Sequence, residues 1–555
     1  MASLDSSRSL LISIHPNFDK SKTVESLTFH VTVSCPDLDT NESLCVLPAS
    51  MPNGTTQSYP ASSIHAFDDQ GHLAIDERDD GRLRHYIVKR KTTGSVLLNF
   101  VAVPVVVNSK TPIGGRYELR RDQGGAQFMG MSVIPIPGDG DFNTRDKYDI
   151  KFSWDLSAAP VGTRGVSSYG EGNVTRRCLV TDIWRMVFVT GPVKSYPPCD
   201  VVSEEKEGFG FYWFGTLPSS MEALPPLCSK LFRKLADFFR DEVSKENPYC
   251  VFVRSVTPAR GFGGTGGIRS FVLDYDSYIA TIHQDEIFYL LAHEMVHNWP
   301  LMQSSSGNDM DLIAWYNEGI GIIRTVPILY TYSVDKNPGV ADYYASVLPY
   351  RVGLVSRDEF LKRINAKLAE YYTNPLRLTS NRDVQDKAWT SPDLQTLSYT
   401  RGMVYLLQLD AAVRDASYNR QSVDEVVLLL LERLRNEERH GIPEWKELIM
   451  SVVGVKALLD FDAMNAGQLI HLPPDTFGPE YKLERIRQRE LDFGFDASSF
   501  FKRTVVGIRE GSEAAKAGVQ EGDEIIWNTS KTRGEDEENR ILAAKRAFRR
   551  KLAVV

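Results

Sequence analysis

The sequence predicts a multidomain α+β protein with an all-β N-terminal domain, a mainly α-helical central domain and a small C-terminal domain of mixed structure. Short β-branched and aromatic runs dominate the N-terminal part, helical periodicity dominates the middle, and a proline-bearing linker precedes a last segment rich in glycine. We place the domains at 1–170, 171–475 and 476–555. A chain of 555 residues is too long for one hydrophobic core, which agrees with this division.

The N-terminal domain is predicted from runs such as LTFHVTVSC, GSVLLNFVAVPVVV and YDIKFSWDL, which are separated by Gly, Pro, Asn and Asp. A stretch rich in Gly, Ser and Pro, residues 157–173, marks its expected far edge.

The central domain is predicted to begin with a helix over 228–245, where apolar residues recur every three or four positions. A short strand, CVFVRSV at 250–256, and the glycine-rich GFGGTGGIRS at 261–270 follow. From about 283 to 460 the pattern is almost wholly helical, and Ser422 with Glu425 predicts a capping box at the start of one helix.

Composition excludes several function classes. The apolar fraction of 42% and the charged fraction of 25% are those of a soluble globular protein. A net charge of -8 argues against nucleic acid as a partner, and no apolar run is long enough to cross a bilayer. The N-terminus does not resemble a secretory signal, and the six scattered cysteines predict reduced thiols. We therefore expect a cytoplasmic protein that has no membrane partner.

The motif His293-Glu294-x-x-His297 predicts a metal site. Residues four apart on an α-helix lie only about 40 degrees apart around its axis, so the two imidazoles can share one ion. A catalytic zinc takes three protein ligands and leaves a position open for water. Glu318, in the later helical segment LIAWYNEGIGII, is the predicted third ligand. The remaining eight histidines have no partner at ligand spacing, and we expect them to be surface or hydrogen-bonded structural residues.

These residues predict the hydrolysis of an amide bond. A zinc ion would lower the pKa of its bound water and polarise a carbonyl group, while Glu294 would accept the water's proton and return it to the leaving amine.

HEMVHNW together with WYNEG is similar to the two-part zinc motif of the gluzincin metallopeptidases. The layout resembles the glycyl aminopeptidase family, with the aminopeptidase N family a more distant relative. The resemblance covers about 145–525 and implies a thermolysin-like catalytic domain followed by a PDZ domain. It also implies one zinc ion held by His293, His297 and Glu318, with Glu294 as the general base.

The family has a tyrosine shortly before a basic residue and a glycine, and SYTRGMVYLLQLD places Tyr399 ahead of Arg401-Gly402. The resemblance implies that Tyr399 donates a hydrogen bond to the developing oxyanion, because its phenol is neutral at pH 7. Without the family, a tyrosine in this position would more often be a packing residue.

The glycine-rich run aligns with the strand edge that holds the substrate backbone in these peptidases. Its predicted substrate-binding residues are Gly263, Gly264, Thr265, Gly266 and Gly267. Glycines allow another chain to approach closely, although a loop without a binding role is the alternative. Gly266 and Gly267 stand where the relatives carry Glu and His, so the carboxylate that would anchor a substrate amine is absent. Glu286, Asp274, Asp276, Asp309 and Asp311 are the substitutes that we consider.

The segments LDFGF (491–495) and VVGIREGSEAAKAGVQEGDEIIWN (505–528) resemble a PDZ domain that we expect to be truncated. Phe493-Gly494-Phe495 would form the loop that binds a C-terminal carboxylate, and packing against the catalytic domain is the equal alternative.

The sequence thus predicts a zinc metallopeptidase, in the first place an aminopeptidase that acts on small peptides. One alternative is a zinc endopeptidase without recognition of a free N-terminus, which the missing carboxylate motivates. The other is a catalytically idle peptide-binding scaffold, which is disfavoured because both histidines, both glutamates and the tyrosine are present.

Overall fold

A computed structural model describes most of the chain in two compact units. The described residues are 8–525 apart from 52–54, 109–110, 112–116, 141–146, 200–207, 258–262, 277–278, 281, 300–301, 303–337, 388–391, 485, 487–492, 497–498 and 500–503. Among them, the first unit runs to Trp299, and the second comprises Met302 and the residues from 338 onward.

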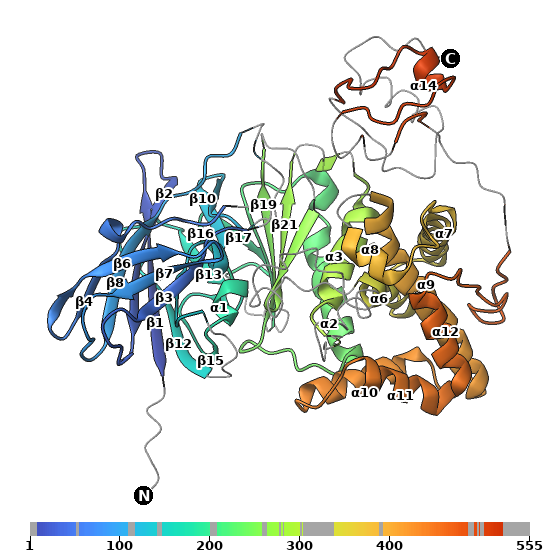
Figure 1. The fold of residues 1–555 in the computed structure, drawn as a ribbon, viewed down its shortest axis with the longest axis horizontal. Coiled ribbons are helices and arrows are strands. Elements are labelled where there is room, and N and C mark those ends of the chain that lie inside the picture. The colour runs from blue at the N-terminus through green and yellow to red at the C-terminus, as the bar shows by residue number, and fades with distance from the viewer. Residues whose placement is uncertain are drawn as a thin grey trace, which may run out of the picture. The chain divides into compact units, whose positions relative to one another are not determined.

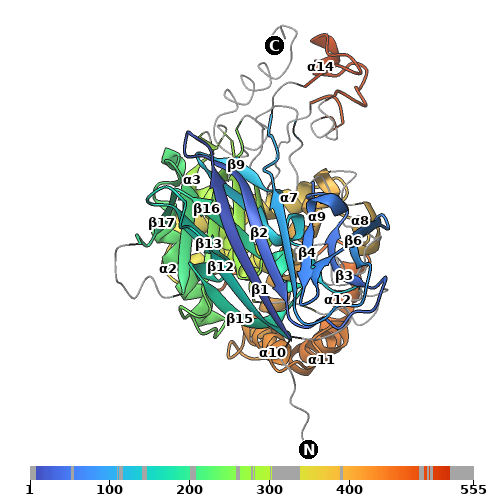
Figure 2. The same cartoon turned by 90° about the vertical axis from the view of Figure 1, so that its left-hand side faces the viewer.

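The first unit begins with a seven-stranded sheet whose broad face is visible in Figure 2. In spatial order its strands are β15 (Val174–Leu179), β12 (Lys147–Trp154), β1 (Ser9–Phe18), β2 (Val24–Val33), β8 (Val96–Ala102), β4 (His65–Asp68) and β5 (Gly71–Leu73). Along β1, Leu10, Ile12 and Ile14 are buried, while the residues between them are more exposed. This period of two directs one face of the sheet into the core.

Two smaller sheets complete the N-terminal β region. One contains β11 (Ile136–Pro137), β3 (Ser43–Pro48), β7 (Leu83–Val88) and β6 (Ile75–Asp79). The other contains β14 (Gly170–Glu171), β13 (Arg164–Ser167), β16 (Val187–Gly191), β10 (Gly125–Met129) and β9 (Arg120–Asp122). Short helical turns connect them: η1 (Ala61–Ser63), η2 (Gly130–Ser132) and α1 (Asp182–Arg185). The all-β character that the sequence predicts for this region is confirmed.

A fourth sheet carries the structure onward toward the zinc motif. Its strand order is β17 (Val193–Tyr196), β18 (Phe209–Phe214), β19 (Tyr249–Ser255), β21 (Ser270–Tyr275) and β20 (Gly263–Gly267). Strands β18, β19 and β21 are parallel, and β20 runs antiparallel to β21. The core is continuous from the N-terminal sheets into this one, because Phe214, Phe252 and Val272 belong to the same buried cluster as Leu10 and Phe128.

Among its described residues, the first unit also has the helical elements η4 (Ser219–Met221), α2 (Leu224–Phe238) and α3 (Gln284–Val296), which follow one another along the chain around this sheet. The strand predicted at 250–256 corresponds to β19. The helix predicted over 228–245 is α2, which ends earlier than its apolar pattern suggests. Arg240 takes a left-handed backbone conformation with φ of 55°, which an α-helix does not continue through.

The described part of the second unit is mainly helical, as predicted (Figure 1). Its helices are α6 (Pro338–Arg351), α7 (Arg357–Thr373), α8 (Asn381–Lys387), α9 (Pro392–Ala416), α10 (Val423–Arg435), α11 (Ile442–Val453), α12 (Val455–Asn465) and α14 (Glu513–Lys516). All of them except α14 pack with or around α9. The predicted capping box opens α10, since the Ser422 amide donates to Glu425 Oε2 at 2.7 Å. No helix in the described ranges has the length and apolar content of a membrane span.

The C-terminal segment has a small core of its own. Phe495, Val505, Val519 and Ile525 are buried together beside the short helix α14. Gly494 has φ of +77°, and a Cβ there would lie 2.5 Å from Ser512 Cβ, so this position in the predicted Phe-Gly-Phe loop requires glycine. A packed segment is therefore present, and its resemblance to a PDZ domain stays a prediction.

A buried arginine of the fourth sheet connects this sheet to the N-terminal β region. Arg254, which is fully buried, donates to both carboxylate oxygens of Asp274 at 3.0 and 2.8 Å. It also donates to the main-chain oxygens of Glu118 and Gln127 at 3.1 and 3.2 Å. Nearby, Asp122 accepts a hydrogen bond from the Ser255 amide at 2.8 Å. Burial raises the pKa of Asp122 to about 6, against the lowering effect of that amide and of Arg254.

The raised pKa of Asp122 predicts a loss of stability as the pH rises. The folded state binds its proton more tightly than the unfolded state, so stability falls between about pH 4 and pH 6. Asp122→Asn has no proton to lose and keeps an oxygen that can accept from Ser255. Its free energy of unfolding should exceed that of the wild type by up to about 3 kcal/mol at pH 7 and by little at pH 4.

Urea denaturation from pH 4 to pH 7 measures this difference. Asp149→Asn serves as the control, because Asp149 pairs with Arg177 at the surface and should matter by less than about 1 kcal/mol. A stability difference for Asp122→Asn that does not vary with pH would contradict the prediction.

Candidate metal centre

Helix α3 carries the first part of the zinc motif. His283 caps its N-terminus, where the Asp285 amide donates to His283 Nδ1 at 3.4 Å. Asp285 and Glu286 lie in the first turn, where negative charge complements the helix dipole. The second half of the helix is buried from Leu291 through Val296, so the motif lies inside the protein.

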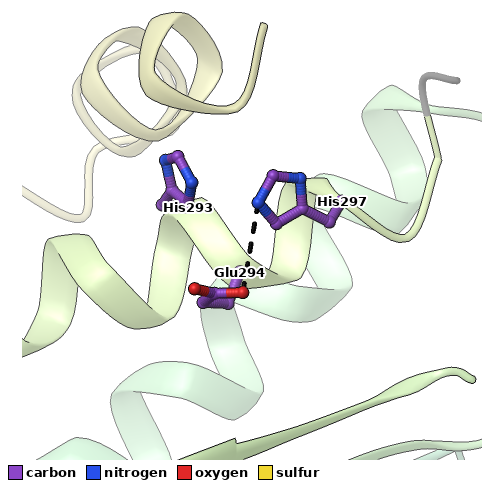
Figure 3. A group of neighbouring side chains, drawn as sticks. All are labelled: His293, Glu294 and His297. Carbon is purple, nitrogen blue, oxygen red and sulfur yellow. Dashed lines mark ion pairs between the residues drawn. The ribbon is translucent and has the colours of Figure 1, made fainter. Parts of the chain in front are cut away.

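His293, Glu294 and His297 converge at the C-terminal end of α3 (Figure 3). Their exposed fractions are 5%, 4% and 9%, and one ligand atom from each residue lies within 4.8 Å of the others. The two imidazole rings are 4.6 Å apart between centroids and nearly perpendicular, at 87°. His297 Nε2 is 4.0 Å from Glu294 Oε2. Two buried imidazoles with a carboxylate beside them form a donor set that fits a zinc ion.

The predicted substrate segment forms an edge of the fourth sheet beside α3. Gly263–Gly267 is strand β20, which pairs with β21 and is the outermost strand in the order that the described residues define. Helix α3 packs against both β20 and β21. A Cβ at Gly264 would lie 1.8 Å from the Phe271 ring, which shows that the backbone and this ring are in close contact. Gly263–Gly267 is therefore a strand and not a loop, and its role in substrate binding stays a prediction.

The structure does not test the roles of the two other predicted site residues. Glu318 lies outside the described residues. Tyr399 lies on α9 and is half-buried, and it belongs to the second unit. The roles of Glu318 and Tyr399 therefore stay predictions.

Of the carboxylates considered as substitutes for the missing amine anchor, the structure shows one to be engaged already and locates two others. Asp274 is already paired with Arg254 through both of its oxygens. Asp276 is buried, Glu286 is exposed in the first turn of α3, and Asp309 and Asp311 lie outside the described residues.

Two contacts at the end of α3 were missed by sequence reasoning. The Tyr249 hydroxyl donates to the main-chain oxygen of Glu294 at 3.3 Å. The Trp299 indole donates to Asp241 Oδ2 at 2.8 Å. Both partners are tens of residues away in the chain, and Tyr249 stands directly before the predicted strand, so periodicity gives no signal for either contact.

A scan against protein-family models finds no match, and a search of curated proteins finds none either. Among solved structures, the chain is similar to an aminopeptidase N family protein from Idiomarina loihiensis, with 15% identity and a TM-score of 0.62. That alignment covers 93% of this chain and 89% of the other. An M1 zinc metallopeptidase from Deinococcus radiodurans, solved as a mutant bound to a Tyr-Ser-Ala substrate, aligns at 13% identity. Its TM-score is 0.49, over 84% of this chain and 94% of that one. The first likeness establishes a shared fold, and we draw no conclusion from the second.

Gly264→Ala is predicted to destabilise the fourth sheet. The new methyl group would meet the Phe271 ring, which is fully buried. Overpacking of this kind costs about 1–3 kcal/mol, to be measured by urea denaturation. The double variant Gly264→Ala/Phe271→Leu should be less destabilised than the two single changes together, because the smaller side chain makes room. Additive losses would show that the clash is not the cause.

Proposed function

We propose that this chain is a zinc-dependent metallopeptidase, and specifically an aminopeptidase that acts on small peptides. One observation carries the proposal: two buried imidazoles and a carboxylate converge on one turn of a helix that packs beside a glycine-rich edge strand. The fold shared with an aminopeptidase N family protein supports it.

His293 and His297 would hold the zinc ion, with Glu318 as the third ligand. When bound, zinc lowers the pKa of a coordinated water toward neutrality and polarises the scissile carbonyl group. Glu294 accepts the proton of the attacking water and transfers it to the leaving amine. Its carboxylate projects beside the imidazoles, with Oε2 4.0 Å from His297 Nε2, which is within the reach of one water.

Strand β20 would bind the substrate by β-type pairing. An edge strand offers main-chain donors and acceptors to an extended peptide. The glycines at 263, 264, 266 and 267 bring no side chain between the strand and that peptide. Tyr399 would complete the site by donating a hydrogen bond to the developing oxyanion.

The zinc endopeptidase is the second candidate function, because the described part of β20 has no carboxylate to bind a substrate amine. The burial of His293, Glu294 and His297 does not support the third hypothesis, a catalytically idle peptide-binding scaffold. Burying two imidazoles and a carboxylate together is unfavourable, and peptide binding alone does not require it.

We further propose that the small C-terminal core around Phe495 is a PDZ-like module. Its ligand would be the C-terminal carboxylate of a peptide, bound at the Phe493-Gly494-Phe495 loop.

Replacing Glu294 by Gln tests the mechanism. The amide keeps the size of the side chain and cannot accept the proton, so kcat should fall by about 10²- to 10⁴-fold while zinc stays bound. His297→Ala is the matched comparison, because it removes a ligand and should lose both zinc and activity. Metal content per chain and the hydrolysis of amino-acid p-nitroanilides are the measurements. A wild-type protein that folds and is purified without zinc, or full activity in Glu294→Gln, would refute the mechanism.

N-acetylation of the substrate separates the two peptidase functions. An aminopeptidase should cleave amino-acid p-nitroanilides with a free amine and leave their N-acetylated counterparts intact. An endopeptidase should be indifferent to acetylation. Comparable kcat/KM values for both series would therefore reject the aminopeptidase and leave the metallopeptidase.

A further inference from the structure

The end of α3 departs from α-helical geometry at the candidate metal centre. In a continuing α-helix, the amide of residue 298 would donate to the carbonyl of residue 294. Here the Asn298 amide donates to the carbonyl of Met295 at 3.0 Å, and the Trp299 amide donates to Val296 at 3.1 Å. Both bonds span three residues, so the chain tightens as it passes His297.

The carbonyl of Glu294 is stabilised by a side chain from another element. The Tyr249 hydroxyl, at the start of β19, donates to it at 3.3 Å, and the bond is buried. A buried carbonyl needs a hydrogen-bond donor, and the Tyr249 hydroxyl supplies one from outside the helix.

Tyr249 is itself rigidly held. Only 1% of its surface is exposed, and its ring stacks on Phe232 with 4.8 Å between centroids. Its main chain is fixed in β19, where it pairs with Phe209 and its amide donates to Gly208 at 2.8 Å. Burial and the nearby Glu294 carboxylate raise the pKa of Tyr249 well above its ordinary value, so the phenol keeps the proton that it donates.

A second anchor holds the same turn from the other end. The Trp299 indole donates to Asp241, which also pairs with Arg269 at 3.1 Å. The Trp299 ring stacks on Phe232 at 5.6 Å, on the residue that also packs against Tyr249. Phe232 therefore packs against both Tyr249 and Trp299, the two residues that hold this turn. His297 lies in the turn, between Glu294 and Trp299 in the chain.

We propose that Tyr249 is a positioning residue for the zinc centre. Through the main-chain carbonyl of Glu294, it fixes the turn from which the general base and the second imidazole both project. This inference rests on the proposed function. It adds that the geometry of the centre is set by a phenol that touches neither substrate nor metal.

Tyr249→Phe removes only the hydroxyl and keeps the stacking on Phe232. With the turn loosened, zinc affinity, measured by competition with a chelator, should weaken by about 10- to 100-fold. For the zinc-loaded enzyme, kcat should fall about tenfold, with KM within about twofold of the wild type.

Tyr59→Phe is the matched control. Tyr59 is also buried, its hydroxyl donates to the main-chain oxygen of Val133 at 2.9 Å, and its ring packs on Phe100 at 4.7 Å between centroids. It lies in the N-terminal β region, so its loss should lower the melting temperature to a similar extent and leave zinc affinity and kcat unchanged.

Trp299→Phe is an independent variant of the same turn, because it removes the bond to Asp241 and keeps an aromatic ring. It should also weaken zinc binding, and it tests the anchored turn even if Tyr249→Phe does not fold. If zinc affinity is unchanged in whichever of these two variants fold, or if Tyr249→Phe matches Tyr59→Phe in zinc affinity and kcat, the inference is overturned. If the wild type neither binds zinc nor hydrolyses peptides, the proposed function fails, and the inference fails with it.

Discussion

The burial of two imidazoles and a carboxylate on a single turn of α3 is the constraint on which the rest of the site depends. Polar side chains removed from water must be oriented by fixed partners, because solvent no longer stabilises alternative orientations. The protein fixes the main chain of this turn through residues from the sheet and from α2. Tyr249 comes from β19, and Phe232 comes from α2. The parallel strand β19 therefore helps to fix the C-terminal end of α3.

The parts of this arrangement that sequence reasoning predicted are those fixed by local spacing. His293 and His297 share a helix face because they are four residues apart, and Ser422 with Glu425 caps α10 because three residues separate them. The glycine-rich run forms a strand, as the family resemblance implies, and Gly264 lies close to the Phe271 ring. In each case the signal and the structure lie within one turn or one strand.

The contacts that sequence reasoning could not predict join residues far apart in the chain. Tyr249 and Glu294 are separated by 45 residues, and Asp241 and Trp299 by 58. The stretch 157–173 contains β13 and β14, and the later strands β15 and β16 pair with β12 and β10. Such pairings are set by the tertiary fold, which a shift in composition does not report.

The pairing of Arg254 with Asp274 bears on which end of a peptide the proposed site can recognise. Asp274 lies opposite Gly263 in the β20–β21 register, whereas Phe271 lies opposite Gly266, the position at which the family resemblance implies an acidic residue. Three residues of strand separate the two positions by about 10 Å. Asp274 is also engaged at both oxygens by a fully buried guanidinium group, and withdrawing it would leave that charge unpaired at a cost of about 3–5 kcal/mol. Both its position and its partner therefore argue against Asp274 as an amine anchor. Since Asp274 is the one acidic residue of β20 and β21, a carboxylate that anchors a free N-terminus in the proposed site would have to come from outside these two strands.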